Sequence, residues 1–281
     1  PTRRSSDLMD VALNDGNRMP REVFGVYRVP PGKDTYELVI SALKVGYRGL
    51  DTASLYRNEA DVGRAVRDSG LARSDVFIIS KVWDADAGWD SSHAALNKSL
   101  NLLAIEYVDL YLIHSPRPGR ELRLSTWRAL INLREFELTR SIGVSNYGAG
   151  HIEEIIAANL PLPAVNQIDR HPMLPRTALM EYCRAKNIII QAHSPLARGR
   201  ILSDPFLMQC AKRYNVSVAQ VCLAWATSTG DCFVIGDKSG QHIKENADTK
   251  GRPMLTGDDM KTISHLRDEL FVMGKDLARV I

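Results

Sequence analysis

Short apolar runs alternate with amphipathic stretches along the 281-residue chain. The apolar runs are rich in β-branched residues, and most are continuously apolar, which is typical of strands covered on both faces. We predict eight such strands, at residues 22–28, 47–51, 76–82, 108–114, 141–146, 164–169, 187–194 and 231–237.

The stretches between these runs repeat apolar residues at spacings of three and four, which indicates helices. Helices are predicted at residues 35–46, 58–70, 91–104, 125–138, 151–160, 176–186, 203–213, 217–228 and 257–269. Repeated alternation of strand and helix predicts an α/β fold, a (β/α)8 TIM barrel. A doubly wound sheet is the alternative, but the residues after position 28 read VPPGKDTYE and lack the GxGxxG motif of that fold. Because no linker or low-complexity segment interrupts the pattern, we expect residues 1–281 to form a single domain.

Composition narrows the function classes. The chain is 44% hydrophobic and 25% charged, and its net charge of +3 comes without a dense Lys/Arg run, so no nucleic-acid partner is expected. No apolar run approaches the ~18 residues of a membrane helix, and the polar start PTRRSSD is unlike a secretory signal. The four cysteines lack CxxC or zinc spacing, which favours reduced thiols in a cytoplasmic protein without a bound metal. We expect a monomer, because nothing in the sequence demands more.

Polar residues follow several predicted strands at the point where each strand ends. In a (β/α)8 barrel these ends form the active-site face. The residues are Asp51, Lys81, His114, Ser145, Asn146, Asn166, Gln167, His193 and Ser194. Each has an ordinary explanation on its own, since an Asp after a strand often caps a helix and a lone Lys is usually solvated. Their regular placement behind apolar runs favours a shared site.

Four of the residues in this region suggest proton transfer. Tyr56 follows Asp51 closely, and Lys81 and His114 end the next two strands. A nearby ammonium favours the phenolate and makes a phenol, whose ordinary pKa is about 10, a better acid. A carboxylate would hold the lysine in place, and a neutral imidazole would orient a carbonyl. The group suits protonation of an oxygen that receives a hydride, and the chain has no HxH or HExxH metal motif.

Along nearly its whole length the chain resembles the aldo-keto reductase family. The segment GYRGLDTASLYRNEADVG, at 46–63, is similar to the family's first signature, and LNDGNRMPREVFGVYRVP resembles its opening strand. The segments SKVW, VDLYLIHSP, GVSNY, VNQIDRHP, AHSPLARG and HIKEN follow in the family's order. The resemblance implies an oxidoreductase that reduces small aldehydes and ketones to alcohols with NADPH.

The resemblance also implies roles for individual residues. Tyr56 would be the general acid, Asp51 and Lys81 would tune it, and His114 would orient the carbonyl. The substrate pocket would be lined by Tyr27, Trp83 and His114. The cofactor, from nicotinamide to adenine, would be bound by Asp51, Ser145, Asn146, Gln167, His193, Ser194, Leu196, Lys238, Ser239, His242, Glu245 and Asn246.

The chain departs from the family pattern at both ends of the cofactor site. His193 stands where the family usually has a tyrosine that stacks on the nicotinamide, and a protonated imidazole there would put a cation beside an oxidised ring. His242 stands where an arginine often clasps the 2′-phosphate, a contact that arginine makes better. Asp237 could favour NADH by binding the ribose hydroxyl. Because Lys238 and Ser239 are present, NADPH is the expected cofactor and NADH the alternative.

Two further sequence features concern the breadth of the substrate pocket. Ser115 follows His114 where many family members have a tryptophan, and the tail after HLRDEL is short. Both features predict an open pocket and a broad range of aldehydes or ketones.

Two other function classes stay open. A nucleotide-binding regulatory subunit could keep the same barrel with little turnover, although the intact catalytic group counts against it. A metal-dependent barrel hydrolase is the third possibility, and the lack of clustered His and Asp ligands counts against that one.

Overall fold

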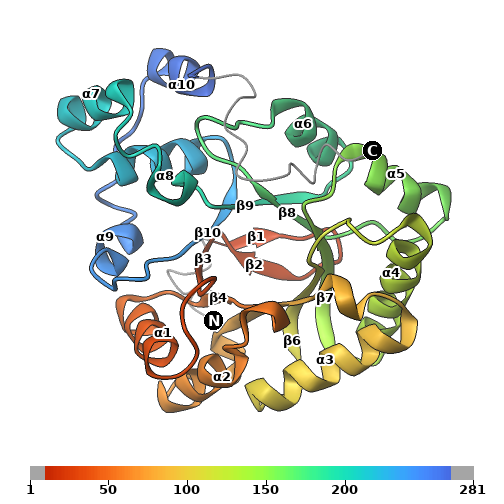
Figure 1. Cartoon of the computed structure of the whole chain (residues 1–281). Coiled ribbons are helices and arrows are strands. Elements are labelled where there is room, and N and C mark those ends of the chain that lie inside the picture. The colour runs from red at the N-terminus through yellow and green to blue at the C-terminus, as the bar shows by residue number, and fades with distance from the viewer. Residues whose placement is uncertain (1–9, 267–281) are drawn as a thin grey trace.

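Eight parallel strands close into a barrel in the computed structural model, which describes residues 10–266 (Figure 1). Neighbouring strands pair in chain order, and β10 pairs with β3 to complete the ring. The strands are β3 (Glu22–Gly25), β4 (Gly49–Asp51), β5 (Phe77–Val82), β6 (Val108–Ile113), β7 (Thr139–Ser145), β8 (Val165–Asp169), β9 (Ile189–His193) and β10 (Cys232–Ile235). Each overlaps one of the predicted runs, so the predicted (β/α)8 barrel is confirmed.

Helices surround the barrel (Figure 1). They are α1 (Lys33–Val45), α2 (Glu59–Asp68), α3 (Trp89–Leu103), α4 (Arg120–Glu135), α5 (Ala149–Ala157), α6 (Thr177–Ala185), α7 (Pro205–Tyr214), α8 (Val218–Ser228), α9 (Ile243–Ala247) and α10 (Gly257–Ser264). The α4 helix begins before its predicted start, because its charged first turn carries little apolar pattern. The last three residues of the helix predicted at 257–269 lie outside the described residues, and so do both ends of the predicted single domain, which stays a prediction.

A short hairpin precedes the barrel and was not predicted. Its strands, β1 (Asp10–Ala12) and β2 (Arg18–Pro20), are too short to show a periodic pattern. Leu13 and Met19 pack against apolar side chains in the barrel interior, and Asn14 donates a hydrogen bond to the Pro163 carbonyl just before β8. The hairpin therefore closes the end of the barrel at which the strands begin (Figure 1), and the other end is left for a site.

The main core lies between the barrel and its helices. It includes the fully buried rings of Trp127 and Trp225. Gly63 of α2 packs so closely on α3 that an added Cβ would lie 2.0 Å from the Leu103 carbonyl oxygen, so no larger residue fits there. Within residues 10–266, no helix is both long and apolar enough to span a membrane.

Candidate active site

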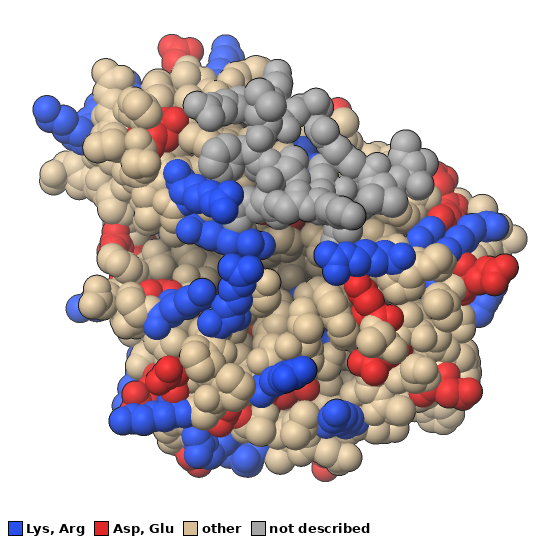
Figure 2. All heavy atoms as spheres, in the orientation of Figure 1, with Lys and Arg blue, Asp and Glu red and all other residues tan. Residues whose placement is uncertain are grey.

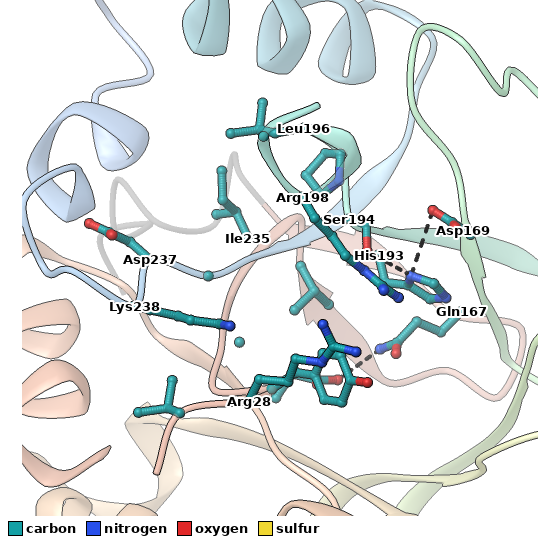
Figure 3. A pocket seen from close by; sticks show the side chains of 18 of the residues that line it. Arg28, Gln167, Asp169, His193, Ser194, Leu196, Arg198, Ile235, Asp237 and Lys238 are labelled. Carbon is teal, nitrogen blue, oxygen red and sulfur yellow. Dashed lines mark hydrogen bonds and ion pairs between the residues drawn. The ribbon is translucent and has the colours of Figure 1, made fainter. Parts of the chain in front are cut away.

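A cavity of about 890 Å³ opens where the barrel strands end. It is one continuous hollow that runs from Tyr56 and His114 to Lys238 and Asn246 in the segments after β10. Figure 3 shows side chains entering it from several different strand ends. Its volume lies in the range of small-molecule and cofactor sites.

Lys81 and Asp51 form a buried ion pair at the floor of this cavity. Their side chains are only 1% and 3% exposed, and Lys81 Nζ lies 2.6 Å from Asp51 Oδ1. The Lys81 ammonium also donates to the Thr52 carbonyl at 3.0 Å and to the Tyr56 hydroxyl at 3.4 Å, which uses its three N–H groups. The Tyr56 hydroxyl accepts from Lys81 and keeps its own proton for a group in the cavity.

A short 3₁₀ turn, η2 (Ser54–Tyr56), brings Tyr56 back over the end of β4. The Ser54 hydroxyl donates to the Lys81 carbonyl at 3.1 Å, which ties the turn to β5. The Tyr56 ring packs against Tyr27, with ring centroids 5.0 Å apart. The phenol is thus held in place by two neighbouring elements.

The protonation of this group differs from the sequence prediction. Burial raises the pKa of Tyr56 well above its usual value, and the Asp51 carboxylate raises it further. Burial also lowers the pKa of Lys81, while Asp51 opposes that change. The prediction of a more acidic phenol is wrong for this structure, because Asp51 balances the charge of Lys81 and burial disfavours the phenolate. Tyr56 therefore keeps its proton until a strongly basic oxygen accepts it.

His114 lies beside the phenol and is neutral. Its ring meets Tyr56 edge-on with centroids 5.7 Å apart, and it meets Trp83 in the same way at 5.0 Å. Burial, and then the charge of Lys81, hold the pKa of His114 well below its ordinary value. Among the described residues, no hydrogen-bond partner faces its buried Nδ1 atom. A neutral imidazole can donate to a carbonyl oxygen without adding a charge.

A second hydrogen-bonded group is built from residues of β7, β8 and β9 and the residue after β7. Asn146, in the left-handed backbone region with φ 62°, donates through Nδ2 to the His114 carbonyl at 3.1 Å and to Ser145 Oγ at 3.0 Å. Its Oδ1 therefore faces His193 Nε2 at 3.0 Å, and the imidazole proton must sit on Nε2. Gln167, in the middle of β8, donates to Asp51 Oδ2 at 2.8 Å and so joins this group to the Lys81–Asp51 pair.

Burial, followed by the positive charges of Lys81 and Arg198, lowers the pKa of His193 to about 3. His193 is therefore neutral at neutral pH, and protonation, which would place a cation there, does not occur.

Replacing His193 by phenylalanine is expected to make the fold less sensitive to acid. Between its unfolded pKa of about 6.5 and its folded value, the unfolded chain binds a proton that the folded chain does not. The free energy of unfolding then falls as pH falls, by at most about 1.4 kcal/mol per pH unit. Urea unfolding near neutral pH and again at about pH 5 would measure the loss. His265→Phe, at an exposed position, is the control, and an equal loss in wild type and His193→Phe would contradict the expectation.

Asp237 shapes the loop after β10. Its carboxylate accepts from Ser239 N at 3.0 Å, Ser239 Oγ at 2.7 Å and His242 N at 2.5 Å. Burial opposes its ionisation, but these hydrogen bonds outweigh burial and lower its pKa. Figure 3 shows Asp237 turned away from the cavity centre and Lys238 pointing into it. The carboxylate is committed to its own turn, which removes the sequence argument that it binds a ribose hydroxyl.

The remaining predicted cofactor residues are spread along the same cavity. Its wall includes Ser194, Leu196, Lys238, His242, Glu245 and Asn246. Ser239 is not in the wall, because its hydroxyl points at Asp237 inside the turn. Asn246 is buried, and its Oδ1 has no hydrogen-bond partner among the described residues. An orphaned acceptor beside a cavity suits a ligand that carries an amine, as adenine does.

Several cavity residues were missed from the sequence. Arg28 and Arg198 lie over the Tyr27 ring, 5.2 and 5.8 Å from its centroid, and Arg117 lies 6.0 Å from that of Trp83. Figure 2 shows basic side chains bordering the hollow on this face. These arginines stand inside or beside the matched segments, but a charge on a loop carries no pattern that marks it as part of a site. Positive charge at the mouth suits an anionic ligand.

Across the described part of the chain, no three His, Cys, Asp or Glu residues are grouped so that they could hold a metal ion. The polar groups of the cavity are arranged instead around an ammonium, a phenol and carboxamides.

The comparisons with known proteins agree with this geometry. Residues 23–268 match the Aldo/keto reductase family. A glyoxal reductase of Bacillus subtilis (strain 168) is 42% identical over 238 residues, which cover 85% of this chain and 86% of the relative. An aldo-keto reductase of Mycobacterium sp. (strain JLS) is 40% identical over 258 residues, covering 92% and 93%. A crystal structure of a Gox0644 mutant in complex with NADPH has a TM-score of 0.90 at 35% identity, covering 97% and 98%. The family predicted from the sequence is confirmed: the chain belongs to the aldo/keto reductase family and is an oxidoreductase.

Proposed function

We propose that the protein reduces aldehydes and ketones to alcohols with NADPH, and that Tyr56 supplies the proton. The observation that carries this proposal is the buried Lys81–Asp51 pair beneath a protonated Tyr56, with neutral His114 beside it. Bound NADPH would supply the hydride. The protein would supply the proton donor and the groups that hold the carbonyl.

In the proposed mechanism Tyr56 and His114 hydrogen-bond the carbonyl oxygen. As that oxygen becomes an alkoxide, its basicity exceeds that of the phenolate, and the Tyr56 proton moves to it. Lys81, which already donates to the Tyr56 oxygen, stabilises the phenolate that is left. Asp51 keeps Lys81 charged and in place. Because its pKa is raised, Tyr56 stays protonated at neutral pH and can act as the proton donor.

The residues around the cavity fit NADPH. Carboxamide-bearing Asn146 and Gln167, with Ser145, suit the nicotinamide amide. Lys238, which points into the cavity at its far end, suits a phosphate. A structural neighbour is described as a complex with NADPH. We assign the nicotinamide to the end near Tyr56 and the adenosine to the end near Lys238 and Asn246.

The substrate end is aromatic and open to solvent. Tyr27 is 42% exposed and forms one wall with Trp83, while the Ser115 hydroxyl donates to Asp84 at 2.6 Å and adds no bulk to the cavity. A relative is described as a glyoxal reductase. We therefore propose small aldehydes and ketones, dicarbonyls such as glyoxal included, as the substrate class.

The proposal is tested by following the absorbance of the reduced nicotinamide with purified protein. NADPH and NADH are each offered with glyoxal, benzaldehyde and an aliphatic ketone. Consumption that needs both cofactor and carbonyl supports the proposal. Tight NADPH binding without turnover on any substrate would favour the nucleotide-sensing alternative instead.

Replacing Lys238 by methionine is expected to raise KM for NADPH by about 10- to 100-fold and to leave KM for NADH within about 3-fold. The reason is that only NADPH carries the phosphate that the Lys238 ammonium would bind. Steady-state kinetics with each cofactor measure the difference. Lys250→Met, at an exposed position outside the cavity wall, is the control. An equal rise in KM for both cofactors would show that Lys238 does not bind the phosphate that distinguishes NADPH from NADH.

We also propose that the protein is a cytoplasmic monomer. Its cysteines, Cys183, Cys210, Cys222 and Cys232, are all buried and free, which suits a reducing compartment. Light scattering of the purified chain tests the oligomeric state.

A further inference from the structure

Gln191 is a buried amide in an apolar part of the barrel. It lies in β9 and is 0% exposed. Residues on other strands of the barrel, such as Val23, Ile79 and Leu110, form a buried apolar cluster. An amide in such surroundings is costly unless its polar atoms are hydrogen-bonded. The contacts of Gln191 therefore need an explanation.

These contacts join the hairpin to the catalytic group. Gln191 Oε1 accepts from Gln167 Nε2 at 2.7 Å, and Gln191 Nε2 donates to the Met19 sulfur at 3.7 Å. Gln167 and Gln191 are direct neighbours in the strand register. The same Gln167 Nε2 donates to Asp51 Oδ2, and Asp51 Oδ1 accepts from Lys81. One hydrogen-bonded series thus runs from Met19 to Lys81.

Each of the two amides in this series can adopt only one orientation. The Asp51 carboxylate is ionised against Lys81 and only accepts, so Gln167 must turn its NH₂ group toward it. The two hydrogens of that NH₂ group are then taken by Asp51 and Gln191. If the Gln191 amide were reversed, two NH₂ groups would face each other. Gln167 is therefore left with Oε1, an acceptor, to offer to a ligand in the cavity that it lines.

We propose that Gln191 is a positioning residue that locks the Gln167 carboxamide, so that Gln167 Oε1 is held ready for the amide N–H of the nicotinamide. This inference rests on the proposed function. Its physical basis is preorganisation: a side chain that is already fixed loses little freedom when the ligand binds. Met19 would support Gln191 only weakly, because a thioether sulfur is a poor acceptor.

The test is Gln191→Met, which keeps the length of the side chain and removes its acceptor. Titration calorimetry with NADP⁺ is expected to show affinity weakened by about 4- to 12-fold, in the upper part of the range that one neutral hydrogen bond contributes. The melting temperature is expected to fall by a few degrees, because the second hydrogen of the Gln167 NH₂ group is left buried without an acceptor. The loss of affinity therefore has to be compared with two variants, one that restores the acceptor and one that changes only the packing.

Two further variants complete the experiment. Gln191→Glu at about pH 6 is expected to bind NADP⁺ within about 3-fold of wild type, because a buried carboxyl stays neutral and its carbonyl oxygen can accept from Gln167. Met19→Leu changes the packing around Gln191 but leaves its bond to Gln167, and is expected to bind within about 2-fold.

The possible results distinguish a failure of the role proposed for Gln191 from a failure of the proposed function. Unchanged NADP⁺ affinity in Gln191→Met, while wild type binds, would overturn the role of Gln191 and leave the proposed function intact. Equal losses of affinity and stability in Gln191→Met and Met19→Leu would also overturn it, since packing would then be the cause. If wild type does not bind NADP⁺, the proposed function fails and this inference fails with it.

Discussion

Replacing Tyr56 by phenylalanine is expected to lower kcat/KM for carbonyl reduction by about 10²- to 10⁴-fold, the usual contribution of a general acid. The hydroxyl is the group removed, and its one hydrogen bond within the described chain is the long one from Lys81. The ring still packs on Tyr27 and His114. Because the fold and the cofactor groove keep their contacts, NADPH affinity is expected to change by less than about 3-fold, a change below the worth of one hydrogen bond.

The measurement is NADPH consumption at saturating cofactor, together with the dissociation constant for NADPH from protein fluorescence. Tyr111→Phe is the matched control, because that hydroxyl is buried without a partner in the described part of the chain and lies outside the cavity wall. Retention of more than about a tenth of the activity by Tyr56→Phe would mean that another group, or water, delivers the proton.

The sequence predicted well which side chains gather at the strand ends, because strand register fixes their place. Asp51, Lys81 and His114 each end an apolar run, and parallel strands in a closed barrel bring those ends to one face. Tyr56 could be added because the turn after Asp51 is short. What the sequence could not give was the protonation of Tyr56, because burial and the balancing charge of Asp51 depend on packing in three dimensions.

Other differences have the same origin. The sequence suggested that Asp237 could bind a ribose hydroxyl. In the structure its carboxylate accepts hydrogen bonds from the backbone N–H groups of Ser239 and His242 in its own turn. In the run NIIIQAHS, nothing in the sequence distinguishes Gln191 from any other polar residue. Its proposed role depends on its hydrogen bond with Gln167 on the next strand. The hairpin before β3 was invisible because its strands have three residues each. The pattern of apolar and polar residues thus predicts where the side chains gather. The hydrogen bonds in the folded structure decide which of their polar atoms remain available to a ligand.

Replacing Lys81 by methionine is expected to lower both activity and stability. The variant would leave the Asp51 carboxylate buried without its cation, and breaking a buried pair in this way costs about 3–5 kcal/mol in the free energy of unfolding. The phenolate of Tyr56 would also lose its stabilising donor, so kcat/KM is expected to fall by at least about 10²-fold. Urea unfolding and NADPH consumption measure the two effects.

The double variant Lys81→Met with Asp51→Asn separates these two effects. Removing the stranded charge is expected to restore most of the lost stability, since replacing both members of a buried pair is often nearly neutral. Activity is expected to stay low, because no ammonium then faces Tyr56. If the double variant were no more stable than Lys81→Met alone, the loss would come from packing rather than from an unbalanced Asp51. If its activity returned, the phenol would not need Lys81, and the proton-transfer unit would have to be assigned to Tyr56 and His114 alone.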